Sequence, residues 1–258
     1  MTALKRAHLL QGLKADVFDD PLVDQTLKGA RNRLAQNFIP KPLRLVISFP
    51  VLKILGDLIS KLNWKPEDRH VIWSTCLTAF FGACRLGEII SQAANTQTDH
   101  TLRWEDVLFS PFNSAVSIFI HMPKTAEDPR GYVIPLSPFK DLRYCPCYWM
   151  RKIYFMWPSP PSMDTPVFRF QSGKLVHMKI VDKILAQLSS FLGTGPNRFA
   201  PHSFRAGLPS FMATHPWDFS YREIKSIGKW RSDTADRYLR LRGAESREIY
   251  RKIGVSMM

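Results

Sequence analysis

Residues 67–94 form a long apolar segment, EDRHVIWSTCLTAFFGACRLGEIISQAA, that restricts how this chain can fold. Charged side chains are sparse after its first four residues, so the segment has no polar face of the kind that lines a solvent-exposed helix. It therefore predicts a pair of largely buried helices. The spacing of apolar residues predicts further helices over 48–63, 145–157 and 174–193.

The spacing of apolar residues changes between these helical segments. Residues 101–109 and 114–122 have the composition of strands, and residues 131–136 form a third. The stretch PKTAEDPRG supplies turn residues between the last two, with Pro129 and Gly131 at its end. The chain is therefore predicted to be α+β and mainly α, with a small three-stranded antiparallel sheet packed on a helical core.

Two prolines in IPKPLR, residues 39–44, separate an N-terminal helical segment from the rest of the chain, because proline breaks a helix and extends the residue before it. The first segment is too short for a robust core of its own. We expect residues 1–40 to be a helical arm or the remnant of an upstream helical domain. The main domain is predicted over 41–243, followed by a tail over 244–258.

The C-terminal third carries clear helix boundaries. Ser220 and Glu223 have the spacing of a capping box, and Gly228 ends the helix that follows. Ser232 is placed to cap a short helix that carries Tyr238. The tail beyond that helix has too few apolar groups to fold alone. We expect it to dock either on an adjacent protomer or on its own domain.

The charge balance favours a polyanionic partner. Lys and Arg number 36 against 22 Asp and Glu, which gives a formal net charge of +14. Each cation that neutralises a phosphate releases a condensed counterion, although a solvated basic surface would have the same composition. An acidic membrane is the other anionic candidate, but no apolar run approaches the roughly 20 residues of a membrane span. The chain also opens with no signal peptide, and no membrane partner is expected.

The four cysteines predict neither a disulfide framework nor a metal site. Cys76 and Cys84 lie in apolar helical sequence, where a free cysteine behaves as a small core residue. Cys145 and Cys147 form a C-x-C pair that is closer than the usual zinc spacing and has no second pair. The pattern fits a reducing compartment.

Several polar residues are harder to explain as parts of a core. Arg85 and Glu88 are three residues apart in apolar sequence, so they are expected to share a helix face as an ion pair. Such a pair is either structural or a means of presenting the remaining guanidinium donors to a phosphate. Lys124 falls in the predicted hairpin turn, where a lysine is either solvated or able to reach into a groove and donate a proton.

His202 and Arg205 are also three residues apart, at a predicted helix start that would favour an anion. Trp230 and Tyr238 would usually be core aromatics, yet Tyr238 lies between arginines in a polar helix. Together the arginines and the indole can hold the non-bridging oxygens of a phosphodiester, and the tyrosine can attack phosphorus. This set would combine charge stabilisation with covalent catalysis and would require no metal or other cofactor.

The order of these residues resembles the catalytic domain of the tyrosine recombinases, the integrase family. The motifs, in chain order, are CRLGE (84–88), PKT (123–125), HSFR (202–205) and GKWRSDTADRY (228–238). Within that family the sequence is most similar to the eukaryotic DIRS-type and Crypton mobile-element recombinases. HSFRAG, the IGKWRSD…RYLR ending and a Cys-Pro pair after the third strand carry that likeness, which covers roughly residues 40–245.

The resemblance implies a role for each matching residue. Arg85 and Arg205 would clamp the scissile phosphate, and Glu88 would support Arg85. Lys124 would be the general acid toward the 5′-oxygen, and His202 would be a general base or phosphate ligand. Trp230 takes the place often held by a second histidine, and Tyr238 would form the 3′-phosphotyrosyl link.

The resemblance also implies partners. A recombinase of this kind acts on double-stranded DNA as a homotetramer on synapsed DNA and would be a monomer or dimer without it. A eukaryotic mobile-element enzyme would work in the nucleus, and otherwise in the cytoplasm or nucleoid. The N-terminal arm is shorter than the family's DNA-clamping helical domain. Alternative functions are a domesticated DNA-binding relative without cleavage, a type IB topoisomerase and a basic helical scaffold.

Overall fold

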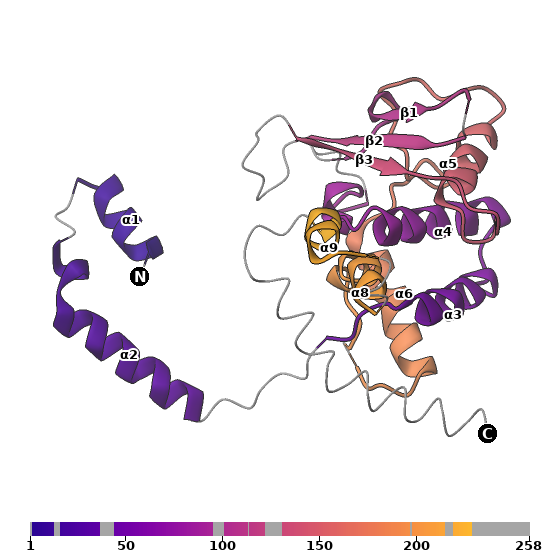
Figure 1. Ribbon diagram of the computed structural model, residues 1–258. Coiled ribbons are helices and arrows are strands. Elements are labelled where there is room, and N and C mark those ends of the chain that lie inside the picture. Colours follow the sequence, from indigo (N-terminus) through magenta and orange to yellow (C-terminus); the bar gives the residue numbers. More distant parts are fainter. Residues whose placement is uncertain are drawn as a thin grey trace. The chain divides into compact units, whose positions relative to one another are not determined.

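The computed structural model describes residues 2–12, 16–36, 44–94, 101–112, 114–121, 131–196, 198–214 and 219–228. The chain divides into two compact units, Met1–Leu43 and Arg44–Met258. The first unit is helical in its described part, as its sequence predicts. It contains α1 (Thr2–Leu10), a 3-10 turn η1 (Asp16–Asp19) and α2 (Pro21–Gln36) (Figure 1).

The second unit is a helical core with one small sheet (Figure 1). Its helices are α3 (Phe49–Ser60), α4 (Pro66–Phe81), α5 (Pro146–Phe155), α6 (Met178–Phe191), α7 (His202–Arg205), α8 (Gly207–Ala213) and α9 (Tyr221–Gly228). Its strands are β1 (Val107–Phe109), β2 (Val116–Ile120) and β3 (Tyr132–Leu136). The predicted class, α+β and mainly α, is confirmed.

Helix α4 is the centre of this unit and contacts α3, α5, α7 and α8. Every residue from Val71 to Phe80 is buried, so α4 has no solvent-facing side over that stretch. Its start is favourable, because Pro66 lies in the first turn and Glu67 and Asp68 complement the helix dipole. Nowhere in the described ranges is a helix both long and apolar enough to cross a membrane.

The second buried helix that was predicted within 67–94 is wrong. After α4 the chain leaves the helix at Gly82 and Ala83, and Ala83 has a left-handed φ of 44°. A single 3-10 turn, η2 (Leu86–Glu88), follows. The Glu88 carboxylate accepts the backbone N–H of Arg85 at 2.8 Å, which gives that donor an alternative to a helical carbonyl. The apolar composition of residues 67–94 does not show that the helix ends at this point.

The sheet is antiparallel with the order β1–β2–β3, and β2 buries Val116, Ile118 and Ile120 on one face. The strand predicted over 101–109 is only partly correct, because Trp104–Asp106 forms a 3-10 turn. Its Asp106 carboxylate accepts the Arg103 N–H at 2.9 Å, and regular pairing starts at β1.

Helix α6 begins four residues later than predicted, because Leu175 and His177 make isolated β-bridges. The capping box ahead of α9 is confirmed: Ser220 N–H donates to the Glu223 carboxylate at 2.7 Å, and Glu223 N–H donates to the Ser220 hydroxyl at 3.3 Å. Ser232 and the tail over 244–258 lie outside the described residues.

The cysteines are all free and buried. The Sγ atom of Cys145 accepts the Tyr148 N–H at 3.4 Å and so caps the start of α5. The Cys147 thiol donates to the Leu136 carbonyl at 3.2 Å. The C-x-C pair is therefore built into the junction between β3 and α5. Within the described part of the chain, no group of three or more His, Cys, Asp or Glu is placed to hold a metal ion.

Candidate functional site

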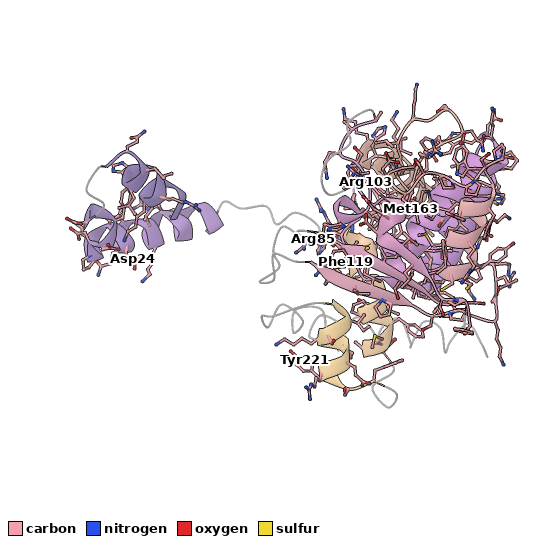
Figure 2. The ribbon with its side chains drawn as sticks, turned by 90° about the horizontal axis from the view of Figure 1, so that it is seen from above. Asp24, Arg85, Arg103, Phe119, Met163 and Tyr221 are labelled. Carbon is pink, nitrogen blue, oxygen red and sulfur yellow. The ribbon has the colours of Figure 1, made fainter. Side chains whose placement is uncertain are left out.

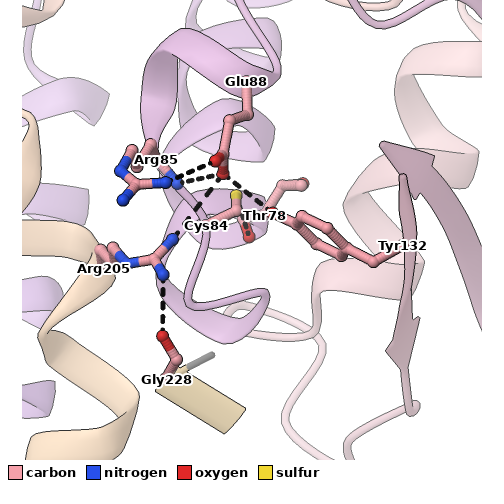
Figure 3. Close-up of polar contacts among 7 residues, drawn as sticks. All are labelled: Thr78, Cys84, Arg85, Glu88, Tyr132, Arg205 and Gly228. Atoms are coloured by element: carbon pink, nitrogen blue, oxygen red, sulfur yellow. Dashed lines mark hydrogen bonds and ion pairs between the residues drawn. The ribbon is translucent and has the colours of Figure 1, made fainter. Parts of the chain in front are cut away.

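Two arginines from distant parts of the second unit meet at one carboxylate (Figure 3). Arg85 immediately precedes η2, and Arg205 is the last residue of α7. The Arg85 Nη1 atom lies 3.0 Å from Oε1 of Glu88, and the Arg205 Nη1 atom lies 3.8 Å from Oε2. The predicted association of Arg85 with Glu88 is therefore present, although the pair spans a 3-10 turn and not an α-helix.

Glu88 is buried and holds its charge through hydrogen bonds. Its Oε2 atom accepts the Arg85 backbone N–H at 2.8 Å and the Tyr132 hydroxyl at 2.8 Å. Burial by itself raises the pKa of a carboxyl group, but these bonds and the Arg85 side chain outweigh it, and the pKa of Glu88 lies below its usual value. Glu88 is thus a fixed anion between the two guanidinium groups.

Arg205 is the most buried cation of the cluster, with 4% of its surface exposed. Its Nη2 atom donates to the Gly228 carbonyl oxygen at 2.8 Å. Its Nη1 atom is buried and has the 3.8 Å ion pair to Glu88 but no hydrogen bond to a described residue. Burial and then the neighbouring charge of Arg85 lower the pKa of Arg205. A buried guanidinium with a spare donor is unfavourable unless an anion satisfies it.

His202 begins α7, one turn ahead of Arg205. Its side chain reaches solvent, yet partial burial lowers its pKa, and the charges of Arg205, Arg85 and Arg44 lower it further. The imidazole is therefore neutral at neutral pH and able to accept a proton. The helix here is a single turn of four residues, so the helix-dipole contribution predicted from the sequence is small, and the neighbouring arginines supply the positive field.

Arg44 belongs to this cluster, and the sequence interpretation missed it as part of a proline-rich linker. Residues 45–47 run beside α7 and the segment before it, because Leu45 N–H donates to the Arg198 carbonyl at 2.7 Å and Ile47 N–H donates to the Ser203 carbonyl at 3.2 Å. Arg44 precedes this seam and is close enough for its charge to affect His202. The sequence feature that could have pointed to Arg44 is its position as a basic residue almost directly after the two prolines.

The HSFRAG motif explains how Arg205 reaches Glu88. Phe204 is fully buried, and Gly207 lies directly against α4. A Cβ atom on Gly207 would lie 2.4 Å from the Phe80 ring and 2.7 Å from the Ile47 carbonyl oxygen. Only a residue without a side chain permits this approach. The close packing of α7 and α8 on α4 carries Arg205 to the end of α4, where Glu88 follows.

Tyr132 is a second residue that the sequence interpretation missed, since it was predicted only to belong to the third strand. It is the first residue of β3 and pairs with Ile120 across the hairpin. Seen from above, Arg85 lies at the end of the sheet where β2 finishes near Phe119 (Figure 2). The site therefore draws on α4's C-terminal end, α7 and the base of the β2–β3 hairpin.

The remaining predicted residues lie outside the described part of the chain. These are Lys124, Trp230 and Tyr238. The elements on either side of them are described: Lys124 belongs to the connection between β2 and β3, and Trp230 follows α9 by two residues. The structure thus brings together Arg85, Glu88, His202 and Arg205, and the roles assigned to all seven residues stay predictions.

The described cluster is suited to an oxyanion. The carboxylate of Glu88 contacts Arg85 and Arg205, and the charge of Arg44 adds to theirs at His202. Planar guanidinium groups present paired donors that match the oxygens of a phosphate. In a partly buried setting such donors stabilise developing negative charge more than they would in water.

Comparison with known proteins supports the fold. No protein-family model matches the sequence, and no curated protein is similar to it in sequence. Among solved structures, the chain is similar to the XerH site-specific recombinase bound to its difH substrate in a pre-cleavage complex, with a TM-score of 0.53 and 12% identity over 81% of this chain. A post-cleavage complex of XerH with palindromic difH gives 0.53 and 13% over 80%.

These similarities concern about half of each XerH chain, 53% in both cases. At such identity they show the fold and not the activity. The mainly helical unit with its three-stranded antiparallel sheet has the fold of a tyrosine recombinase catalytic domain. The predicted fold is therefore confirmed.

Proposed function

We propose that this protein is a site-specific DNA recombinase that cuts and rejoins double-stranded DNA through a covalent 3′-phosphotyrosyl intermediate. One observation carries the proposal: the buried Nη1 atom of Arg205, beside Arg85 and Glu88, has a donor that no described residue satisfies by a hydrogen bond. A phosphodiester oxygen is the anion that would complete this cluster. The fold shared with XerH agrees with that assignment.

In the proposed reaction Arg85 and Arg205 hold the two non-bridging oxygens of the scissile phosphate. The Tyr238 oxygen attacks phosphorus, so that a bond forms between them while the bond from phosphorus to the 5′-oxygen breaks. Lys124 gives a proton to the departing 5′-oxygen. The guanidinium charges stabilise the extra negative charge of the transition state. Strand exchange reverses these steps with a 5′-hydroxyl from another duplex.

His202 is proposed to take the phenolic proton of Tyr238. A general base must be unprotonated at the working pH, and burial with three nearby arginines keeps the pKa of His202 below its ordinary value. Trp230 would donate its indole N–H to the phosphate. Glu88 contributes by holding both arginines, since it contacts each of them.

The finer assignment is a DIRS-type or Crypton-like enzyme that integrates or excises a mobile element in the nucleus. It rests on the HSFRAG and IGKWRSD motifs of the sequence. The same assignment implies a homotetramer on two synapsed sites. Residues 41–243 would form the catalytic domain and the arm would contact DNA. The tail would pack either on an adjacent protomer or on its own domain.

A nicked suicide duplex tests the proposal. Once the strand is cut, the short fragment that carries the new 5′-hydroxyl diffuses away, and the protein stays attached to the 3′ phosphate of the remaining strand as an adduct visible by denaturing electrophoresis. The wild-type chain should form the adduct, and Tyr238→Phe should bind DNA without forming it. Adduct formation by Tyr238→Phe would show that another residue is the nucleophile.

Binding without any adduct from the wild-type chain would point instead to a DNA-binding relative that no longer cleaves. Adducts accompanied by relaxation of supercoiled plasmid, but with no exchange between two sites, would point to a topoisomerase. The two readouts therefore separate the proposed function from both alternatives.

A further inference from the structure

A cavity of about 310 Å³ opens between α3, the first half of α4 and the start of α5. It is separate from the arginine cluster, because it borders Arg69 and Trp73 in the N-terminal half of α4, whereas Arg85 follows the C-terminal end of that helix. Between Trp73 and Phe81, the last residue of α4, the helix rises about 12 Å. The volume is at the lower end of the range for small-molecule sites, so the cavity suits a small ligand.

Aromatic rings form the walls of the cavity, and hydrogen bonds fix two of them. The indole N–H groups of Trp73 and Trp149 both donate to the backbone carbonyl oxygen of Arg143, each at 2.9 Å. The Tyr144 ring packs edge-on against Trp73 with 6.2 Å between the ring centroids, and the His70 ring lies 5.2 Å from that of Trp149. Because both indole N–H groups are used within the chain, the indoles offer carbon surface to a ligand. The walls therefore favour a flat apolar group.

Gly56 keeps the α3 side of the cavity open. It lies inside α3, where glycine is less favourable for the helix than alanine. A Cβ atom at this position would lie 3.0 Å from Cη2 of the Trp73 ring. An alanine here would thus favour the helix but crowd the wall of the cavity.

Arg69 is held at the cavity by the end of α3. Its Nη1 atom donates to the backbone carbonyl oxygens of Ser60 at 2.6 Å and Leu62 at 3.4 Å. Among the described residues, none forms a hydrogen bond with its Nε or Nη2 atom, and this edge of a guanidinium can bind both oxygens of a carboxylate. Arg143 also lines the cavity, but its guanidinium is paired with Asp141 at 2.9 Å. Arg69 is therefore the group that could bind an anion here.

The charges around the rings disfavour a cationic ligand. The Lys152 ammonium group lies 4.6 Å from the centroid of the Trp149 ring, and the Arg143 guanidinium lies 5.5 Å from that of Tyr144. The chain's own cations thus already occupy the ring faces that a ligand cation would use. Asp57 lines the cavity as well, but it is exposed, and solvent and salt screen an exposed charge.

We propose that this cavity binds a small aromatic carboxylate, a flat system of one or two rings that carries one carboxyl group. The rings would lie among Trp73, Tyr144 and Trp149, and the carboxylate would accept hydrogen bonds from Nε and Nη2 of Arg69. The site goes beyond the proposed recombinase function and includes none of the residues assigned to DNA cleavage. Its test uses no DNA, so its failure and that of the proposed function are distinguishable.

The full chain is titrated with 2-naphthoate, and 2-naphthamide is the matched neutral probe. The readout is the NMR signals of the tryptophan indole N–H groups, assigned through single Trp→Phe variants. The acid should shift the signals of Trp73 and Trp149 to saturation. The signal of Trp104, which is buried against Tyr154, should not move. The amide should bind about tenfold to a hundredfold more weakly, which is the effect of losing hydrogen bonds between two charged groups.

Two variants test the two parts of the site. Arg69→Ala should weaken binding of the acid to the level of the amide and leave the affinity for the amide unchanged. Gly56→Ala should weaken both probes, because its methyl group narrows the space beside Trp73. Lys65→Ala is the control, since Lys65 is an exposed cation directly before α4 that does not line the cavity, and it should bind both probes as wild type does.

Several results would overturn the proposal. These are an absence of shifts at Trp73 and Trp149, equal affinities for the acid and the amide, and an affinity of Arg69→Ala for the acid that matches wild type. An equal loss in Lys65→Ala and Arg69→Ala would also overturn it, because general charge attraction would then explain the binding. If Arg69→Ala does not fold, the comparison of acid with amide and the Gly56→Ala variant still decide the question.

Discussion

Arg205 and Gly228 are joined by a hydrogen bond of 2.8 Å from the guanidinium Nη2 atom to the carbonyl oxygen. Gly228 is the last residue of α9, and the Trp230 to Tyr238 segment begins just beyond it. One nitrogen of Arg205 therefore fixes the end of the helix that leads to the proposed nucleophile, while the other lies beside Glu88. The proposed phosphate contact and the anchoring of the end of α9 therefore depend on the same side chain.

Replacing Arg205 with lysine should therefore be almost as damaging as replacing it with alanine. A lysine keeps the charge but has no planar fork to contact Gly228 and a phosphate together. Loss of one such donor set slows comparable reactions by about a hundredfold to a thousandfold. Single-turnover adduct formation on the nicked duplex measures the effect. A lysine variant with near wild-type rates would show that charge alone is needed.

The general acid can be tested separately from the clamp. Lys124→Ala should be slow on an ordinary duplex and largely restored on a 5′-phosphorothiolate duplex, because a thiolate leaves without protonation. Arg85→Ala should show no such recovery, since it removes charge from the transition state. The ratio of the two rates for each variant is the measured quantity. Equal, unrecovered losses would contradict the role given to Lys124.

Gly207→Ala should destabilise the second unit. The added methyl group would meet the Phe80 ring at 2.4 Å and a backbone oxygen at 2.7 Å, and overpacking of this kind costs about 1–3 kcal/mol. In a domain of this size that corresponds to a fall in Tm of roughly 2–12 °C. Gly29→Ala is the control, because nothing lies within 4 Å of its Cβ position in α2. Equal melting curves for Gly207→Ala and wild type would contradict the packing.

Glu88 should make stability depend on pH in the acid range. Its pKa in the folded protein is below the ordinary value of 4.5, so the unfolded chain takes up this proton first as the pH falls. The stabilisation is complete above about pH 4.5 and is lost as the pH falls further toward the folded pKa. Urea unfolding between pH 3 and 6 should show a shallower decline for Glu88→Gln than for wild type. Identical slopes would rule out a contribution from Glu88.

DNA affinity should fall steeply with salt, by a log–log slope of about −0.9 for each phosphate contact on a duplex. If Arg44 contacts one phosphate, Arg44→Ala should lower the magnitude of that slope by about 0.9. Lys53→Ala is a suitable control, because the Lys53 ammonium group lies over two aromatic rings, that of Phe49 in α3 and that of Tyr144 in the loop before α5. Titration at several salt concentrations provides the slopes. No difference between Arg44→Ala and Lys53→Ala would remove Arg44 from the DNA contacts.

Much of the fold followed from periodicity, because the helices and the three strands have clear apolar patterns. The two larger errors fall where a side chain competes with the backbone. The carboxylates of Glu88 and Asp106 each accept a backbone N–H three residues earlier, and these local bonds replace a helix in one case and part of a strand in the other. Composition does not distinguish an acid that bonds its own backbone from one that faces solvent.

For the site, the sequence predicted that Arg85, Glu88, His202 and Arg205 act together, because each stands in a motif with unusual polar content. The structure brings the four side chains close to one another, and their roles stay predictions. Arg44 and Tyr132 could not be found in that way. Each lies in an ordinary context, one after a proline pair and one at the start of a strand. Only the three-dimensional packing of residues 45–47 and the register of β3 bring them to the cluster.

The seam of backbone hydrogen bonds at Leu45 and Ile47 has a practical consequence for anyone who shortens this chain. Those two residues are bonded to positions 198 and 203, and Ile47 also lies under Gly207 with no exposed surface. A truncation that starts at Arg44 would preserve both hydrogen bonds, whereas one that starts at the helix boundary, Phe49, would remove both of these backbone contacts to α7 and the segment before it. We expect the shorter fragment to be less soluble than the fragment that starts at Arg44, and we expect α7 to be displaced in it. The safe place to cut is therefore set by long-range pairing and not by where the first helix begins.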